Sequence, residues 1–359
     1  MVDRDISALQ RLDREYAERE AGVRVPPSRT VRRVSMVDVA GRAGVSGQTV
    51  SRVVNGSPRV DPLTRARVEA AMRELGYRPH RAARALRTGR TQTIGLVAAT
   101  LATVGNSRML QAVADAAAAR GYALVVVTLG SSGDVGTAFE SLRDQGVDGA
   151  IVLNEATAWV SAADAPADLR LVVVDAPDAG RFDVVQTDHA AGAALATGHL
   201  LGLGHRRVHH VAGPAGSFAA DERERGWRTT LADAGAPASD PLRGDWTAAC
   251  GHRIGGQLAA NPAVTAVFAA NDQMALGVLR ALAEAGRRVP EEVSVVGFDD
   301  VIDAADYRPP LTTVHQDFDA LGARAVATLV AGIEHAAAPA LQTVPAELVV
   351  RASTAAALR

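Results

Sequence analysis

The chain has 359 residues, a formal net charge of −2 and a single cysteine, Cys250. That length can hold a small domain together with about two domains of ordinary size. One cysteine excludes an intramolecular disulfide, and no apolar run reaches the roughly 18 residues that a membrane-spanning helix needs. These observations predict a cytoplasmic protein without a membrane partner.

The charge is distributed unevenly along the chain. Residues 36–90 sum to +7 and residues 91–359 to −11, so one end is suited to phosphate groups and the rest is not. Residues 1–34 are rich in charges of both signs and contain Pro26-Pro27, a composition typical of a flexible extension. The alternative is an arm whose arginines add nonspecific phosphate contacts.

Two short helices joined by a tight turn are predicted near the start of the basic segment. Ser35 and Asp38 have the spacing of a capping box, so a helix begins there, and Gly44 breaks it. Ser46 then caps a second helix over residues 47–54. Its apolar side faces inward, and its polar side could enter a DNA major groove.

A third helix completes this small unit, with Asp61 as its cap, Pro62 in its first turn and Gly76 at its end. Residues 35–90 contain eleven arginines and only four acids, which favours a DNA-binding headpiece. A helical protein-interaction module with a solvated arginine face is the alternative. The positions expected to form the core are Met36, Val39, Ala40, Ala43, Val50, Val53, Val54, Val68, Ala71, Met72 and Leu75.

This segment resembles the headpiece and hinge of the lac repressor (LacI) family. The resemblance is carried by Val39-Ala40, Ala43-Gly44-Val45-Ser46, Gln48-Thr49-Val50-Ser51-Arg52-Val53-Val54-Asn55, Gly76-Tyr77-Arg78-Pro79 and Ala82-Ala83-Arg84-Ala85-Leu86. It implies a hinge that folds into a short helix in the minor groove of operator DNA. The DNA contacts that it implies are Ser46, Gly47, Gln48, Thr49, Ser51, Arg52, Asn55, Arg59, Ala83, Arg84 and Leu86. Gly47 occupies the first base-reading position, where the resemblance implies an aromatic side chain, so the operator should differ there.

From Thr93 onward, short apolar runs alternate with alanine-rich amphipathic segments. Strands are predicted over Ile94–Ala98, Ala123–Val127, Gly149–Leu153, Leu171–Val174, Val208–Ala212, Ala266–Ala269 and Val293–Val296. Helices are predicted over Leu110–Arg120, Ala191–Leu201, Glu224–Ala234, Cys250–Ala260 and Gln273–Ala285. Continuous apolar strands that alternate with helices predict a doubly wound α/β fold with parallel sheets covered on both faces.

Polar residues gather where these strands end. Asp175, Asn271 and Asp299 follow or end such runs, and Gly213-Pro214 leads to Arg223. Because ligands bind at the carboxyl ends of parallel strands, these groups could hold the vicinal hydroxyls of a sugar. Trp246 could add a ring face for a pyranose. The alternative, that strand-end acids only cap the next helix, is favoured for Asp272 and Asp300.

The same family resemblance extends over residues 34 to about 345. It is carried by Gly226-Trp227, Gly244-Asp245-Trp246, Asn271 to Gly277, Val293 to Asp300 and Pro309 to Phe318. It implies a core of the periplasmic-binding-protein type, in which the chain crosses three times between two Rossmann-like subdomains. The effector pocket that it implies is formed by Asp175, Arg223, Trp246, Asn271, Asp299, Gln316 and Phe318. The wall over Ala99–Asn106 matches poorly, which leaves the ligand group on that side open.

The resulting organisation has four parts. They are a flexible extension (1–34), a helix-turn-helix headpiece (35–79), a hinge helix and linker (80–91) and a core for effector binding and dimerisation (92–359). The core should divide into one subdomain of about 92–187 with 316–342 and another of about 188–314 with 343–359. No heptad-bearing helix follows Ala346 to Arg351, so a homodimer is expected.

Other functions find little support in the sequence. His209 and His210 are adjacent on a probable strand and so face opposite ways, which argues against a metal cluster with His199 and His205. No phosphate-binding glycine motif and no nucleophile elbow is present, so we expect neither a cofactor nor an enzyme.

We expect a sequence-specific repressor that binds near-palindromic double-stranded operator DNA and responds to a small sugar or glycoside. The resemblance implies that this effector releases the repressor from its operator. The resemblance makes a β-galactoside the leading candidate. The alternatives are a sugar sensor whose headpiece contacts protein and a regulator that depends on a corepressor.

Overall fold

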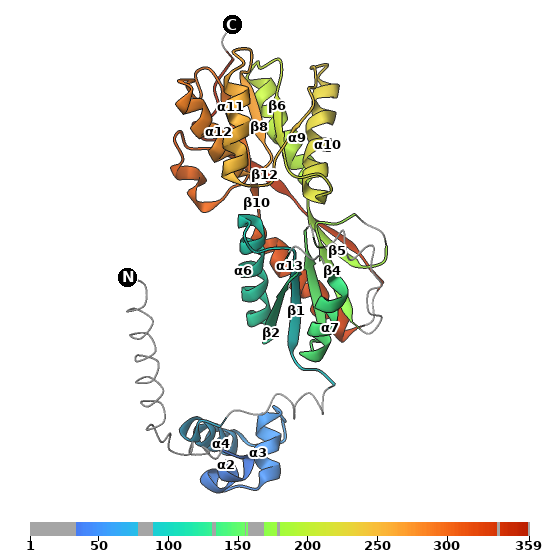
Figure 1. Cartoon of the computed structure of the whole chain (residues 1–359). Coiled ribbons are helices and arrows are strands. Elements are labelled where there is room, and N and C mark those ends of the chain that lie inside the picture. Colours follow the sequence, from blue (N-terminus) through green and yellow to red (C-terminus); the bar gives the residue numbers. More distant parts are fainter. Residues whose placement is uncertain are drawn as a thin grey trace, which may run out of the picture. The chain divides into compact units, whose positions relative to one another are not determined.

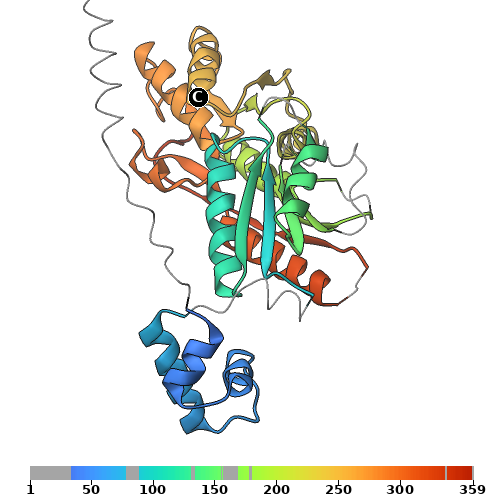
Figure 2. The same ribbon diagram turned by 60° about the horizontal axis from the view of Figure 1, so that its bottom comes forward.

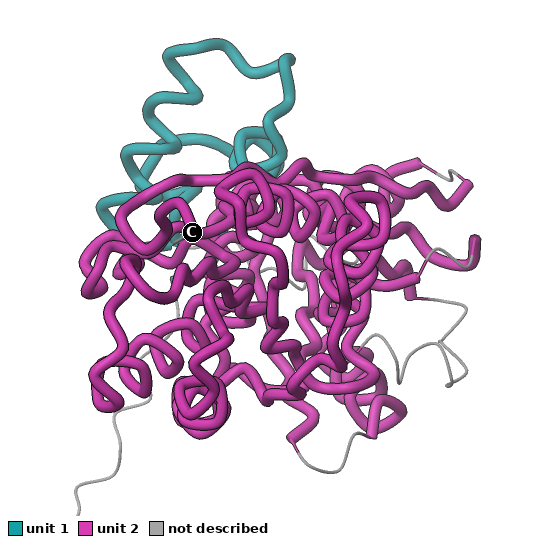
Figure 3. The backbone as a smooth tube through the Cα atoms, turned by 90° about the horizontal axis from the view of Figure 1, so that it is seen from above, with its two compact units in different colours: residues 1–84 teal, residues 85–359 magenta. Residues whose placement is uncertain are grey.

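The computed structural model describes residues 34–77, 89–130, 134–154, 156, 169–177, 180–335 and 338–357. The chain forms two compact units, residues 1–84 and 85–359, which Figure 3 shows in different colours. No helix within the described ranges has the length and apolar character to cross a membrane.

The first unit contains the three predicted helices, α2 (Met36–Ala43), α3 (Gly47–Val54) and α4 (Pro62–Leu75). The predicted caps are confirmed. The Ser35 backbone N–H donates to Asp38 over 2.8 Å, and the carboxylate of Asp61 accepts from the Thr64 N–H over 2.9 Å. Gly44 and Gly76 end their helices at φ values of 65° and 64°, which glycine adopts without strain. The predicted core is also present, with Met36, Val54, Met72 and Leu75 packed around its edge.

The second unit is built on two six-stranded sheets that lie end to end (Figure 1). The first sheet has the order β11-β5-β4-β3-β1-β2, and the second has the order β12-β10-β9-β8-β6-β7. The strands of the first sheet are β1 (Thr93–Ala98), β2 (Ala123–Thr128), β3 (Gly149–Leu153), β4 (Arg170–Val174), β5 (Asp183–Thr187) and β11 (Leu341–Val344). Those of the second are β6 (His209–Ala212), β7 (Leu242–Arg243), β8 (Ala266–Ala269), β9 (Ser294–Asp299), β10 (Thr312–Gln316) and β12 (Ala346–Val349).

Helices cover both faces of each sheet, as continuous apolar strands require (Figures 1 and 2). Around the first sheet lie α6 (Val104–Ala119), α7 (Val135–Asp144) and α13 (Phe318–Glu334). Around the second lie α9 (His189–Gly202), α10 (Phe218–Asp233), α11 (Ala248–Ala259) and α12 (Asp272–Glu284), together with the short 3₁₀ helix η1 (Ile302–Asp306). Among the strands that the structure describes, all the pairings are parallel except that of β10 with β12. The expected fold class is therefore confirmed.

The chain passes between the two sheets after β5, after β10 and between β11 and β12. The second and third crossovers come two residues further along the chain than expected. Gln316 still pairs with Ala346 in the second sheet, and Val344 still pairs with Thr187 in the first. Backbone pairing therefore extends to Gln316 in the second sheet and to Val344 in the first.

Several elements differ from their predicted extent. α6 and α10 begin six residues before the expected starts at Leu110 and Glu224. The hydroxyl of Thr103 caps α6 by accepting from the Asn106 N–H, whereas Ser217 precedes α10 without a side-chain capping bond. Helices α7 and α13 and strands β5, β7, β10, β11 and β12 were not predicted. Strand β11 is largely exposed and β5 contains a charged residue, so neither forms a continuous apolar run.

Candidate functional site

The seven pocket residues expected from the sequence line one cavity in the second unit. Asp175 follows β4, Asp299 ends β9 and Gln316 ends β10. The carboxyl ends of both sheets therefore meet at this cavity, as the fold requires. The full lining is Thr103, Gly105, Asn154, Asp175, Ala219, Arg223, Trp246, Asn271, Asp299, Gln316 and Phe318.

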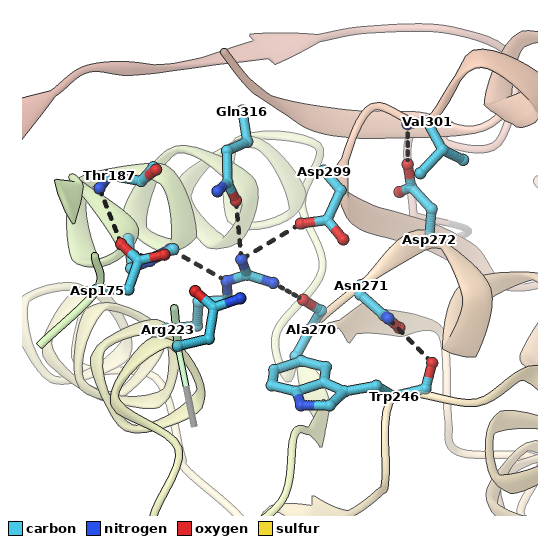
Figure 4. A network of polar contacts seen from close by, with 12 residues as sticks. Asp175, Thr187, Arg223, Trp246, Ala270, Asn271, Asp272, Asp299, Val301 and Gln316 are labelled. Atoms are coloured by element: carbon cyan, nitrogen blue, oxygen red, sulfur yellow. Dashed lines mark hydrogen bonds and ion pairs between the residues drawn. The ribbon is translucent and has the colours of Figure 1, made fainter. Parts of the chain in front are cut away.

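Arg223 on α10 is the centre of the polar network in the cavity (Figure 4). Arg223 is only 4% exposed. The guanidinium donates to Gln316 Oε1 over 3.1 Å, to Asp299 Oδ1 over 3.3 Å and to the carbonyl oxygen of Ala270. It also lies 3.7 Å from the centre of the Phe298 ring. Burial lowers the pKa of Arg223, and the nearby carboxylates oppose that shift. A guanidinium keeps its proton in proteins, so the side chain is charged.

Asp299 is the carboxyl group that faces Arg223. Burial is the main cause that raises its pKa to about 6, and the charge of Arg223 opposes the rise. The residue has a φ of 109°, an uncommon conformation for a side chain other than glycine. A carboxyl group with this pKa changes its charge near neutral pH, so it can respond to a ligand or to acidity.

Asp272 and Asp300 have structural partners, although neither caps a helix. The carboxyl group of Asp272, the first residue of α12, accepts from the Val301 N–H over 2.9 Å through Oδ2, and its Oδ1 lies 2.5 Å from the Thr313 hydroxyl. Asp300 lies 2.7 Å from an Arg351 nitrogen. Both carboxyl groups hold segments of the second sheet together, and neither lines the cavity.

Asn271 both caps a helix and lines the cavity. Its Oδ1 accepts from the Met274 N–H over 2.9 Å, and its Nδ2 donates to the carbonyl oxygen of Trp246 over 3.0 Å. The Trp246 ring packs on Gly213, where an added Cβ would lie 2.2 Å from the ring. Glycine at position 213 therefore allows the ring to form one wall of the cavity.

Sequence reasoning missed His189, which connects two of the predicted residues. Its Nδ1 accepts from Arg223 Nε over 3.3 Å, and its Nε2 lies 2.9 Å from Asp175 Oδ1 without hydrogen-bond alignment. Asp175 also accepts from the Thr187 N–H over 3.1 Å. Because Nδ1 accepts, the proton of a neutral ring must lie on Nε2, facing Asp175. The only local signal for His189 was its place after Asp188, the N-cap of α9.

Asn154, Thr103, Gly105 and Ala219 also line the cavity and were not predicted. Asn154 directly follows β3, so the strand-end rule that selected Asp175 would have found it as well. Thr103 and Gly105 lie at the start of α6, inside the segment that matched the family poorly. Their contribution depends on how α6 is placed above the first sheet.

The histidines considered for a metal site have other contacts. His210 stacks on Phe268 with ring centres 4.7 Å apart, and burial lowers its pKa to about 4. His205 contacts the hydroxyls of Thr265 and Ser294. Within the described parts of the chain, no three histidine, cysteine or acidic side chains gather as a metal ion would need.

In the headpiece, the predicted DNA-contacting residues lie on and around α3. Gln48, Arg52, Asn55 and Arg59 are exposed, as is Ser46, whose hydroxyl caps α3 by accepting from the Thr49 N–H over 3.2 Å. Three further predicted residues are half-buried: Gly47, Thr49 and Ser51. The predicted hinge contacts Ala83, Arg84 and Leu86 lie outside the described residues.

Comparison with known proteins identifies the family. Residues 35–80 match the family model described as bacterial regulatory proteins, lacI family, and residues 197–354 match a periplasmic binding protein-like domain. The lactose operon repressor of Escherichia coli strain K12 is 37% identical over 327 residues, which cover 89% of this chain and 91% of that protein. The chain belongs to the lacI family. It is a DNA-binding transcriptional repressor that is regulated by a sugar or another effector.

Other relatives differ in the small molecule that their names mention. The ribose operon repressor of Escherichia coli strain K12 is 36% identical over 303 residues, with 82% of this chain and 92% of that protein covered. A lac repressor dimer bound to operator and the anti-inducer ONPF has a TM-score of 0.80 and 37% identity, over 90% of this chain and all of that one. A complex of the regulator CelR with cellobiose has a TM-score of 0.67 and 34% identity, over 89% of this chain and all of that one. Members of this family are regulators rather than enzymes.

Proposed function

We propose that this repressor leaves its operator when a neutral sugar or glycoside binds in the cavity around Arg223. The observation that carries the proposal is the buried guanidinium of Arg223, ringed by carboxylate and amide oxygens that also line the cavity. A β-galactoside is the leading candidate, supported by the 37% identity to a lactose operon repressor. The ribose and cellobiose in the names of other relatives make these sugars the competing candidates.

The charges in the cavity favour a neutral ligand over an anionic one. The buried ionisable groups in the lining are two carboxyl groups, Asp175 and Asp299, and one guanidinium, Arg223. A phosphate or carboxylate on the ligand would add an anion beside two carboxyl groups away from water, which is costly. A polyol instead donates to carboxylates and accepts from a guanidinium, and the Trp246 ring offers an apolar face for a pyranose.

The DNA-binding part of the proposal rests on the exposed face of α3. Gln48 and Arg52 are exposed on this helix and can reach base edges in a major groove. We propose that a homodimer presents two headpieces to the half-sites of a near-palindrome, and that Leu86 of each hinge enters the central minor groove. Arg84 and the other arginines would hold phosphates, and such a repressor would act in the cytoplasm.

The two sites are coupled if the effector binds two conformations of the dimer with different affinity. In the proposed mechanism, effector binding closes the cavity and shifts the amino-terminal subdomains of the dimer. The hinges of the two subunits then contact each other less closely, and ordering them on DNA costs more free energy. Operator affinity falls as a result.

Calorimetric titration with methyl β-galactoside, methyl β-glucoside, cellobiose, ribose and galactose 6-phosphate tests this function. We expect one neutral sugar to bind and to lower operator affinity, measured by fluorescence anisotropy at constant salt, and the sugar phosphate not to bind. A sugar that raises operator affinity would show a corepressor-dependent regulator. Sugar binding without any duplex-DNA binding in a randomised selection would show a sensor, and turnover of a glycoside would show an enzyme.

A further inference from the structure

The α6 side of the cavity contains a pair of amide side chains to which the proposed function assigns no role. Asn154 follows β3 and lines the cavity. Asn106 lies in the first turn of α6 and is only 1% exposed. A hydrogen bond from Asn154 Nδ2 to Asn106 Oδ1 joins the two amides. The contact links residues 48 positions apart in the chain.

A backbone carbonyl sets the direction of the hydrogen bonds in this pair. Asn106 Nδ2 donates over 2.9 Å to the carbonyl oxygen of Thr100, which can only accept. The other end of the Asn106 amide must then be its oxygen, which accepts from Asn154. If the Asn154 amide flipped, two oxygens would face each other. Asn106 therefore holds Asn154 with its nitrogen toward α6 and its carbonyl oxygen on the opposite side of the amide.

The backbone of Asn154 places it with the other polar residues of the cavity. Its φ is 45°, and Asp175, Trp246 and Asp299 have φ values of 56°, 71° and 109°. Residues other than glycine adopt such values rarely, and they cluster at ligand sites. Asn154 thus shares this backbone conformation with three residues that we propose to contact the effector.

We propose that Asn154 accepts a hydrogen bond from a hydroxyl group of the effector, and that Asn106 is the positioning residue that orients this acceptor. The inference rests on the proposed function, because it adds a contact to the same ligand. Thr103, Gly105 and Asn154 form a part of the lining without a ring or a charge. This wall suits the hydroxyl-bearing second unit of a disaccharide. It does not suit an alkyl or aryl group that lacks a donor.

Matched pairs of ligands test the inference by calorimetry on the full chain. Each pair joins a disaccharide to the methyl glycoside of its first sugar: lactose with methyl β-galactoside, and cellobiose with methyl β-glucoside. We expect the wild type to bind the disaccharide of one pair at least tenfold more tightly than its partner. Asn106→Ala and Asn154→Ala should each bring this ratio close to one. If Asn106 acts through Asn154, the double variant should lower the ratio no further than Asn154→Ala alone.

Ser107→Ala is the matched control. Ser107 is exposed in the same turn of α6, and its hydroxyl donates to the carbonyl oxygen of Leu101 over 2.7 Å, outside the cavity lining. Its removal disturbs the same loop and should leave the ratio unchanged. A general loss of structure would weaken both members of a ligand pair equally, so the ratio separates recognition from stability.

The outcomes distinguish this inference from the function on which it rests. Sugars that bind with equal affinity within each pair, or a ratio that persists in both asparagine variants, would overturn the role of the amides and leave the proposed function intact. Additive effects of the two substitutions would overturn the positioning role of Asn106. A wild type that binds no sugar at all would overturn the proposed function. Should Asn106→Ala fail to fold by circular dichroism, Asn154→Ala still decides whether the acceptor contacts the ligand.

Discussion

At the scale of single residues, burial decides how the carboxyl groups of the second unit ionise. Asp299 and Asp272 are 6% and 0% exposed, and burial is the largest cause that raises the pKa of each. Arg223 opposes the shift at Asp299, whereas Asp272 is raised further by the charge of Asp299. The two groups therefore titrate in different ranges of pH.

Effector affinity should fall when the pH falls through about 6, the raised pKa of Asp299. Above that pH the carboxylate accepts a charge-assisted hydrogen bond from a sugar hydroxyl, and below it the proton removes this charge. Calorimetric titration of the effector from pH 5 to 8 checks the prediction. In Asp299→Asn the affinity should be lower and nearly independent of pH over this range. An unchanged pH profile in that variant would assign the titration to another group.

The stability of the protein should fall as the pH rises toward 8, because burial raises the pKa of Asp272 to about 8 from 3.8. Between these values the folded state keeps a proton that the unfolded state releases. The contribution is complete below the unfolded value and is lost as the pH rises through the folded one. Its size is on the order of several kcal/mol.

Asp272→Asn should remove most of the dependence of stability on pH. Its amide resembles the protonated acid, with the oxygen toward the Val301 N–H and the nitrogen toward the Thr313 hydroxyl. Denaturant unfolding at pH 5 and pH 9 measures the change. Equal slopes of stability against pH in the two proteins would mean that Asp272 is not the titrating group.

At the scale of elements, helices α11 and α12 pack closely because glycines stand where the two backbones meet. A Cβ at Gly277 of α12 would lie 2.1 Å from the Ala248 carbonyl oxygen, and one at Gly251 of α11 would lie 2.2 Å from the Met274 carbonyl oxygen. The backbones of α11 and α12 thus touch at two reciprocal points. This packing positions the start of α12, where Asn271 and Asp272 lie.

Gly277→Ala should reduce the free energy of unfolding by about 1 to 3 kcal/mol, because backbone must move to admit the methyl group. Gly256→Ala is the matched control in α11, where no atom lies within 4 Å of the added Cβ. It should be neutral or stabilise the protein by about 0.5 to 1 kcal/mol, since alanine is the better helix former. Denaturant unfolding compares the two, and equal effects would show that α11 and α12 are less tightly packed than described.

Helix α3 should carry base recognition in the headpiece. Gln48→Ala removes an exposed amide from its outward face and should cost about 1 to 3 kcal/mol of specific binding, with relaxed preference at one base pair. Arg59→Ala, in the exposed turn before α4, should weaken all sequences alike. Selection from a randomised operator library separates the two. An unchanged preference profile in Gln48→Ala would mean that another face of α3 meets the DNA.

At the scale of the whole molecule, the chain crosses between the two sheets three times, and the cavity lies where their carboxyl ends meet. The residues around Arg223 come from elements of both sheets, since Asp175 follows β4 and Asp299 ends β9. A ligand held by both groups would favour one relative arrangement of the sheets. Coupling to the operator is then a property of the whole chain.

Effector and operator should weaken each other's binding by the same factor, which linkage requires of two coupled sites. Arg223→Ala should lower effector affinity at least tenfold, since lost partners in a buried site cost about 1 to 3 kcal/mol or more. Operator binding without effector should stay near wild type. Titrations of each ligand with and without the other, at constant salt, measure the effect of effector on operator affinity and the effect of operator on effector affinity. Arg225→Ala is the control, because that exposed side chain on the same helix pairs only with Glu222 among its described contacts.

A folded Arg223→Ala protein that loses sugar and DNA binding together would contradict two separate, coupled sites. Unequal factors in the two wild-type titrations would show that the measured binding steps do not share one equilibrium. Unchanged effector affinity in Arg223→Ala would remove the guanidinium from the recognition of the ligand.

The sequence by itself determined the parts of this protein that depend on neighbouring residues. The capping box at Ser35, the left-handed ends at Gly44 and Gly76 and the proline at position 62 are local features, and they define the three headpiece helices. The α/β class was determined in the same way, because strands covered on both faces must be continuous apolar runs. The strand-end rule and the family resemblance also selected seven residues that the structure brings into one cavity.

Only the tertiary structure decided what depends on distance in space. Strands β11 and β12 exist because β5 and β10 offer them edges, and their own sequence has no continuous apolar run. The contact of His189 with Arg223 spans 34 residues, and that of Asn106 with Asn154 spans 48. The protonation of Asp272 likewise depends on its complete burial. Local periodicity carries none of this information, because burial and the partners of a polar group are determined by segments that meet only after the sheets have formed.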